Sequence, residues 1–229
     1  MAYLSRNKAY EKKEPTKDAK KVYIFCEGES NGTEIKYLNY FKGLSSNIDI
    51  ILIPSSRGTD PLKLRFNARV LFSGNSPTYE LSEEYKDEVW FVIDTDEWNI
   101  GDKIEQLKAF CKENARWFVV QSNPCFELWL YYHFYDQKPV SENVAAYSTF
   151  KAFVDAQIKG GFDARRMPAE LETAIQNSRQ NFETEDGQPK LYSTEVHILG
   201  AVINSFVKQQ LDEIKQKMAA ERARNQLSK

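Results

Sequence analysis

Four short runs of β-branched and aromatic residues recur along the first 135 residues of the chain. Each has the length of a β-strand, and they cover residues 20–26, 47–54, 88–93 and 115–122. Each run is followed by a segment with apolar residues at helical spacing, for example Ile104, Leu107 and Cys111. This alternation of strand and helix predicts an α/β fold, with a mostly parallel sheet and flanking helices.

The helix expected after the second strand has a start signal of its own. Asp60 is suited to the N-cap position, where its carboxylate accepts a backbone N–H, and Pro61 is suited to the first helical position. The very apolar segment after the fourth strand, residues 124–134, likewise begins with a proline. Both segments are therefore predicted to be helices.

Strand patterns disappear beyond about residue 136. Residues 141–158 and 166–182 each have the spacing of a helix, and a long helix is predicted from about Thr194 towards the C-terminus. The apolar start of that last helix suits either a dimer or partner surface or packing back on the core. We divide the chain into three parts: a polar N-terminal tail (1–20), an α/β core (20–135) and a helical C-terminal region packed on the core (136–229).

Composition excludes several classes of protein. Of the 229 residues, 41% are hydrophobic, which is ample for a packed core. No apolar run approaches the length of a membrane span, and the N-terminus has no secretory h-region, so neither is expected. Cys26, Cys111 and Cys125 are scattered, which favours buried thiols in a reducing cytoplasm over disulfides or a zinc site.

Charge is unevenly distributed along the chain, although the net charge is only −2. Residues 1–20 and 208–229 are both rich in Lys and Arg, which leaves the middle of the chain acidic. The acidic middle would suit a carboxylate metal site. The basic ends either contact phosphates or are simply solvated tails.

Acidic residues follow two of the predicted strands. Glu27 comes directly after the first strand, and Asp94 and Asp96 come at the end of the third. If these strands are parallel neighbours, the three carboxylates converge at one edge of the sheet, where they repel one another unless a cation lies between them. Because no His or Cys is expected beside them, these oxygen ligands favour Mg²⁺ or Mn²⁺. The alternative is that Asp94 caps the next helix and Asp96 is merely exposed.

Three other positions carry candidate chemistry. Glu127 lies near the start of the segment after the fourth strand and is either a further metal ligand or a buried, paired carboxylate. His133 lies among aromatic residues, which favours a core histidine over a proton-transfer residue. The loop around Arg57 is either a phosphate cradle at a helix start or an ordinary loop.

Three sequence blocks resemble the RloB-like family. They are "CEGESNGTEIKYLNYF", "VWFVIDTDEWN" and "SNPCFELWLYYHF", and the late segment "LYSTEVHILGAVI" is similar to the closing motif of that family. The resemblance covers about residues 20–205. RloB-like proteins are bacterial phage-defence proteins related to the Toprim fold of topoisomerases and primases, so the resemblance implies a Toprim-like sheet.

The resemblance also implies an activity. It points to a metal-dependent nuclease that hydrolyses RNA, including tRNA, or DNA in anti-phage abortive infection, beside an ABC- or SMC-like partner ATPase. Glu27 matches the Toprim glutamate and Asp94 and Asp96 match the metal-binding DxD motif, so these three residues with Glu127 are the expected catalytic set. Glu29 falls in the first block.

Roles follow from that assignment. Asp94 and Asp96 would hold the cation with Glu27, and Glu27 would act as general base or acid. Arg57, Glu29 and His133 are the candidates for contacts with substrate. Two other functions stay open: a non-catalytic metal or nucleotide-binding module that regulates a partner ATPase, and a phosphotransfer enzyme acting on a small molecule. Homo-oligomerisation through the C-terminal helix is a further expectation.

Overall fold

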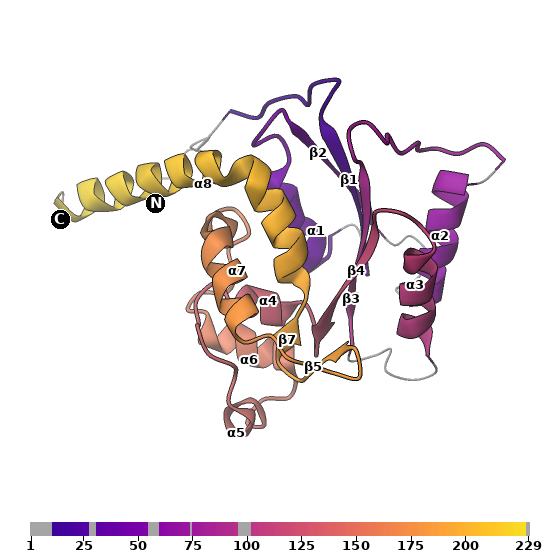
Figure 1. The fold of residues 1–229 in the computed structure, drawn as a ribbon. Helices are drawn as coiled ribbons and strands as arrows, with labels where there is room; N and C mark the ends of the chain where they lie inside the picture. The colour runs from indigo at the N-terminus through magenta and orange to yellow at the C-terminus, as the bar shows by residue number, and fades with distance from the viewer. Residues whose placement is uncertain (1–10, 28–30, 55–59, 74, 96–101, 228–229) are drawn as a thin grey trace.

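A computed structural model describes residues 11–27, 31–54, 60–73, 75–95 and 102–227. Its centre is a five-stranded sheet in the order β2-β1-β3-β4-β7 (Figure 1). Parallel pairing joins the first four strands, and β7 pairs antiparallel with β4. The strands are β1 (Lys20–Cys26), β2 (Ile48–Pro54), β3 (Glu88–Asp94), β4 (Trp117–Asn123) and β7 (Ser193–Thr194). The predicted α/β class with a mostly parallel sheet is therefore confirmed.

Helices cover both faces of this sheet (Figure 1). One face carries α2 (Pro61–Ser73) and α3 (Lys103–Lys112). The other face carries α1 (Thr33–Leu38) with the 3₁₀ turn Asn39–Phe41, α4 (Glu127–Tyr131), α7 (Leu171–Gln180) and α8 (Val196–Leu227). Of the remaining helices, α6 (Phe150–Gln157) packs against α4, and α5 (Ser141–Val144) lies below α6 in Figure 1. The 3₁₀ turn Met167–Glu170 packs against α7 and α8.

Alternating side chains of the central strands fill the two layers. In β1, Val22 and Ile24 belong to the core beneath α1, α4, α7 and α8, whereas Tyr23 and Phe25 belong to the core beneath α2 and α3. A strand that is buried on both faces reads as an unbroken apolar run, which is why the sequence pattern of β1 is continuous rather than alternating.

Strands β1 and β3 lie next to each other at the centre of the sheet. Their parallel register pairs Cys26 with Val92, so the two strands end at the same edge. Glu27 and Asp94, the acids at the ends of these two strands, therefore lie close together, as the sequence predicts.

The predicted start of α2 is confirmed. The Oδ1 atom of Asp60 accepts the backbone N–H of Leu62 at 2.8 Å, and Pro61 is the first helical residue. The other carboxylate oxygen of Asp60 pairs with the Lys103 ammonium at 2.6 Å, which ties the start of α2 to α3.

Two predictions about the C-terminal region are wrong. Strands do occur beyond residue 136: β5 (Thr184–Glu185) and β6 (Gln188–Pro189) form a hairpin, and β7 joins the main sheet. Two-residue strands are too short to show a period of two, although Asp186-Gly187, with φ of 49° and 75°, is a typical hairpin-turn pair.

The single helix predicted over 141–158 is also wrong, because the chain breaks into α5 and α6. Thr149 is extended, with φ −145° and ψ 158°, and its hydroxyl accepts the N–H of Ala152 at 3.1 Å. A threonine side chain that bonds the backbone in this way starts a new helix instead of continuing the old one.

The C-terminal region packs closely on the sheet. The hydroxyls of Ser122 and Thr194 are 2.8 Å apart, and Glu195 Oε2 accepts the N–H of Gln121 at 3.0 Å. Apolar residues at the start of α8, among them Leu199 and Ile203, are buried in the core. The apolar face of α8 is thus used within the chain. No helix among the described residues is both long and apolar enough to cross a lipid bilayer.

We expect the packing of α2 to be a measurable part of the stability. Leu64 is fully buried in the layer beneath α2, so Leu64→Ala should lower the free energy of unfolding by about 2–5 kcal/mol in urea denaturation. Phe66→Ala on the same helix is the control, because Phe66 is 63% exposed. Equal losses in the two variants would contradict this placement of the helix.

Candidate metal centre

Two carboxylates meet where β1 and β3 end. Glu27 follows the last residue of β1, and Asp94 is the last residue of β3. The backbone N–H of Asp94 donates to Glu27 Oε2 at 2.8 Å, and both residues are buried. Because the two strands are neighbours in register, the sheet itself places Glu27 beside the backbone of Asp94.

A second contact joins Asp94 to the segment after β4. Its Oδ1 atom accepts the backbone N–H of Phe126 at 2.9 Å, directly before α4 begins. The N–H of Thr95 donates to the carbonyls of Ser122 and Pro124, both at 2.9 Å. Asp94 therefore binds the backbone directly before α4. The alternative drawn from the sequence was that Asp94 caps the helix after β3.

Cys125 and Glu127 complete a compact cluster with Asp94. The Sγ atom of Cys125 and one carboxylate oxygen from each acid all lie within 4.8 Å of one another. All three residues are buried, with exposures of 7% for Asp94, 1% for Cys125 and 8% for Glu127. The predicted ligands were all oxygens, and the structure adds the Cys125 thiol to them.

Glu127 has an oxygen whose hydrogen-bonding capacity is unused. Among the described residues, Oε2 of Glu127 is buried and has no hydrogen-bond partner. A buried carboxylate oxygen without a partner costs free energy, because it has given up its water. Two carboxylates and a thiol are also chemically suitable ligands for a divalent cation. The residues present therefore fit a metal ion.

Lys151 lies at the same cluster and was missed by sequence reasoning. Its Nζ atom is 3.9 Å from Glu127 Oε1, and its side chain is 57% exposed. Burial lowers the pKa of Lys151, but the charges of Glu127, Asp94, Cys125 and Glu34 together raise the pKa above its ordinary value. Lys151 thus stays protonated. The sequence could not predict this placement, because Lys151 lies on α6, far from Glu127 along the chain, and its local pattern is that of any lysine on an exposed helix face.

Glu34 on α1 is a further buried acid of this neighbourhood. Burial, with a smaller contribution from the charge of Glu127, raises the pKa of Glu34 above its usual range, while Lys151 and a backbone hydrogen bond lower it. Burial and the charge of Glu34 also raise the pKa of the Cys26 thiol well above its ordinary value. Burial, more than neighbouring charge, therefore favours the protonated forms of Glu34 and Cys26.

His133 lies in the core rather than at the cluster. Its Nε2 atom is 3.2 Å from the Tyr37 hydroxyl and its Nδ1 atom is 3.0 Å from the Trp129 carbonyl. Burial lowers the pKa of His133 to about 4, so its ring is neutral at physiological pH. This buried, hydrogen-bonded environment agrees with the interpretation of His133 as a core histidine.

Three predicted site residues, Asp96, Glu29 and Arg57, lie outside the described residues. The loop 55–59, which the sequence offers as a phosphate cradle or an ordinary loop, also lies outside the described residues.

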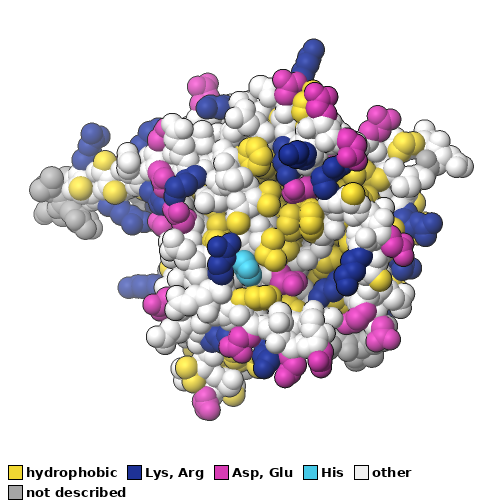
Figure 2. Space-filling view, in the orientation of Figure 1, with side chains coloured by type: hydrophobic (Ala, Val, Ile, Leu, Met, Phe, Trp, Pro, Cys, Tyr) yellow, Lys and Arg dark blue, Asp and Glu magenta, His cyan; other side chains and the backbone are white. Residues whose placement is uncertain are grey.

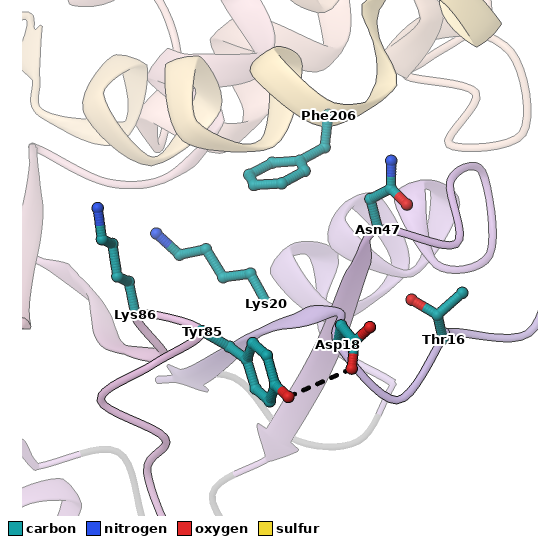
Figure 3. A pocket seen from close by; sticks show the side chains of 7 residues that line it. All are labelled: Thr16, Asp18, Lys20, Asn47, Tyr85, Lys86 and Phe206. Carbon is teal, nitrogen blue, oxygen red and sulfur yellow. Dashed lines mark hydrogen bonds between the residues drawn. The ribbon is translucent and has the colours of Figure 1, made fainter.

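A separate hollow lies at the opposite edge of the sheet, where the strands begin. It has a volume of about 630 Å³ and is lined by Thr16, Asp18, Lys20, Asn47, Tyr85, Lys86 and Phe206 (Figure 3). Lys20 pairs with Glu88, and the Tyr85 hydroxyl donates to Asp18 Oδ1 at 3.2 Å. Unlike this hollow, the carboxyl edge brings together candidate metal ligands and a partnerless buried oxygen, so it is the better candidate for chemistry.

The family model described as "RloB-like protein" matches residues 22–201 of the chain. No curated protein and no solved structure matches it.

The raised pKa of Glu34 predicts a pH-dependent effect of Glu34→Gln. When the folded pKa of an acid is above its unfolded value, the folded state binds more protons between the two values, so ionisation destabilises the fold as pH rises. The substitution should therefore stabilise the protein at pH 8, measured by urea unfolding in EDTA, and the gain should vanish near pH 4. Glu142→Gln on exposed α5 should change little at either pH. A loss of stability at pH 8 in Glu34→Gln would contradict this account.

Proposed function

The chain belongs to the RloB-like family, and we propose that it is a metal-dependent nuclease that hydrolyses phosphodiester bonds in RNA, tRNA included, or in DNA. The observation that carries this proposal is the partnerless buried oxygen of Glu127, which lies beside Asp94 where the central parallel strands end. Ligand sites of open α/β sheets gather at this edge.

Each side chain of the cluster has a role in the proposed reaction. A divalent cation such as Mg²⁺ or Mn²⁺, when bound, neutralises phosphate charge and makes water a better nucleophile. Asp94 and Glu127 would hold it, together with Asp96. Glu27, which is fixed by the backbone N–H of Asp94, would take the proton from the attacking water.

Lys151 would contact the substrate. Its ammonium is held near Glu127, yet more than half of the side chain is exposed, so it faces both the cluster and solvent. A protonated lysine in this position can bind a phosphate oxygen and stabilise charge that develops during cleavage. The helical C-terminal region would thus supply a cationic group to a site whose other side chains come from the α/β core.

The biological setting in this proposal comes from the family. We place the nuclease in cytoplasmic anti-phage defence, in abortive infection beside an ABC- or SMC-like ATPase. All three cysteines are buried in the structure, which suits structural thiols in a reducing compartment.

Two observations favour the second candidate function, a non-catalytic module that binds a metal or nucleotide and regulates a partner ATPase. All three clustered ligand residues are buried, which limits the approach of a polymeric substrate. On the face seen in Figure 2, Lys and Arg side chains are interspersed with Asp and Glu instead of forming one broad basic surface. The two functions predict different results when Asp94 is replaced: a nuclease loses cleavage of nucleic acid, whereas a non-catalytic module has no cleavage activity to lose.

Asp94→Asn should abolish metal-dependent cleavage while leaving the fold intact. The asparagine oxygen can still accept the N–H of Phe126, but the charge that holds the cation is lost. The assay incubates the protein with total tRNA, single-stranded DNA and duplex DNA, each with Mg²⁺, Mn²⁺ or EDTA. Asp18→Asn, at the opposite edge of the sheet, is the matched control. Full activity in Asp94→Asn would remove Asp94 from the proposed site.

Lys151→Met should slow the cleavage step by about 10- to 100-fold, the usual value of a charge-assisted hydrogen bond. Lys151→Arg should restore part of the rate because it retains the charge. Single-turnover rates with saturating protein separate this effect from weaker binding, and Lys159→Met, on an exposed loop, should cleave at the wild-type rate. A wild-type rate for Lys151→Met would rule out a contact with the reacting phosphate.

A further inference from the structure

We propose that Cys125 is a metal ligand, and that Asp94, Cys125 and Glu127 form a mixed oxygen–sulfur site for a thiophilic divalent ion of the Zn²⁺ or Co²⁺ class instead of Mg²⁺. This inference rests on the metal centre of the proposed function and names the ion that the centre selects. A site with oxygen ligands alone prefers Mg²⁺. Here the Cys125 thiol lies beside the two carboxylates, and a sulfur ligand favours a softer ion.

The geometry is suited to a single ion. Zinc binds thiolate sulfur at about 2.3 Å and carboxylate oxygen at about 2.0–2.2 Å, so two ligands of one ion lie at most about 4.5 Å apart. The three ligand atoms of the cluster lie within 4.8 Å of one another. Small side-chain adjustments therefore bring all three atoms to bonding distance.

The site also contains a group that needs a cation. Oε2 of Glu127 is buried without a hydrogen-bond partner among the described residues, and Glu127 Oε1 is 3.9 Å from the Lys151 ammonium. That separation is longer than a charged hydrogen bond, which is about 2.7–2.9 Å. The carboxylate is thus only partly compensated by Lys151, and an ion bound through Oε2 would supply the rest.

The backbone holds two of the ligands in place before any ion arrives. Cys125 and Glu127 flank Phe126, whose N–H is held by Asp94 at 2.9 Å, and the carbonyl of Cys125 accepts the N–H of Leu128 at 3.0 Å. Asp94 therefore positions the segment that carries the other two ligands. Such preorganisation lowers the entropy lost when an ion binds.

Binding has a defined proton balance. The S–H bond of Cys125 breaks, the sulfur–metal bond forms, and one proton is released to solvent. The affinity for the ion should consequently rise with pH. Three charged groups bear on this equilibrium besides the ligands themselves: Lys151 on α6, which competes with the ion for Glu127, Glu34 on α1, and Glu27 at the end of β1.

Cobalt is the probe that tests this assignment, because a thiolate bound to Co²⁺ gives a near-ultraviolet charge-transfer band that oxygen ligands do not give. Protein stripped with EDTA is titrated with Co²⁺, and calorimetry in parallel records the stoichiometry. We expect one ion per chain and the band in the wild type. Zn²⁺ should abolish the band at equimolar concentration, whereas a large excess of Mg²⁺ should not.

Cysteine variants locate the ligand. Cys125→Ser should lose the band and bind Co²⁺ about 100-fold more weakly or worse, since even outer-shell changes cost 10- to 100-fold. Cys111→Ser is the matched control, because Cys111 is also buried but belongs to the layer beneath α3. Cys125→Ala, with its fold checked by circular dichroism, guards against misfolding of the serine variant.

The outcomes separate this inference from the proposed nuclease. Stoichiometric Co²⁺ binding without the band, or with an equal band in Cys125→Ser, would overturn the role of Cys125 and leave an oxygen-only metal centre standing. No binding of Co²⁺, Zn²⁺ or Mn²⁺ to the wild type would overturn both. Metal binding as expected but no cleavage of any nucleic acid would sustain this inference and count against the nuclease.

Discussion

The burial of several carboxylates at the carboxyl edge of the sheet is the constraint on which this structure depends. Glu27, Glu34, Asp94 and Glu127 are all buried there, and each negative charge has lost most of its hydration. Backbone N–H groups offset part of this cost at Glu27 and Asp94. Lys151 offsets another part, and the partnerless oxygen of Glu127 is what remains. A bound cation is the simplest way to balance that remainder.

Topology explains how one edge gathers these groups. The two central strands are parallel neighbours, so residues that follow them in sequence lie side by side in space. The turn after β4 is held to Asp94 and brings Cys125 and Glu127 to the same place. Finally, α6 packs against α4 and contributes Lys151. The C-terminal region therefore completes the electrostatics of a site whose ligands come from the α/β core.

Much of this arrangement could be predicted from the sequence, because its causes are local. The unbroken apolar runs of β1 and β3, the Asp60-Pro61 start of α2 and the acids at strand ends all carry their signal within a few residues. Lys151 and Cys125 carry no such signal. Whether a thiol or an ammonium faces the acids depends on where distant helices pack. The interruption between α5 and α6 was not predicted, because the apolar residues of 141–158 have helical spacing throughout. The hydrogen bond from the Ala152 N–H to the Thr149 hydroxyl starts a new helix despite that spacing.

The most direct test of this account is whether an ion binds at Glu127. Isothermal titration of Mn²⁺ and of Zn²⁺ into EDTA-stripped protein should give one site per chain. In Glu127→Gln, which retains the size of the side chain but not its charge, that site should be lost or at least strongly weakened. Equal affinities in the wild type and Glu127→Gln, or no binding to either, would contradict the claim that this buried carboxylate exists to hold a metal ion.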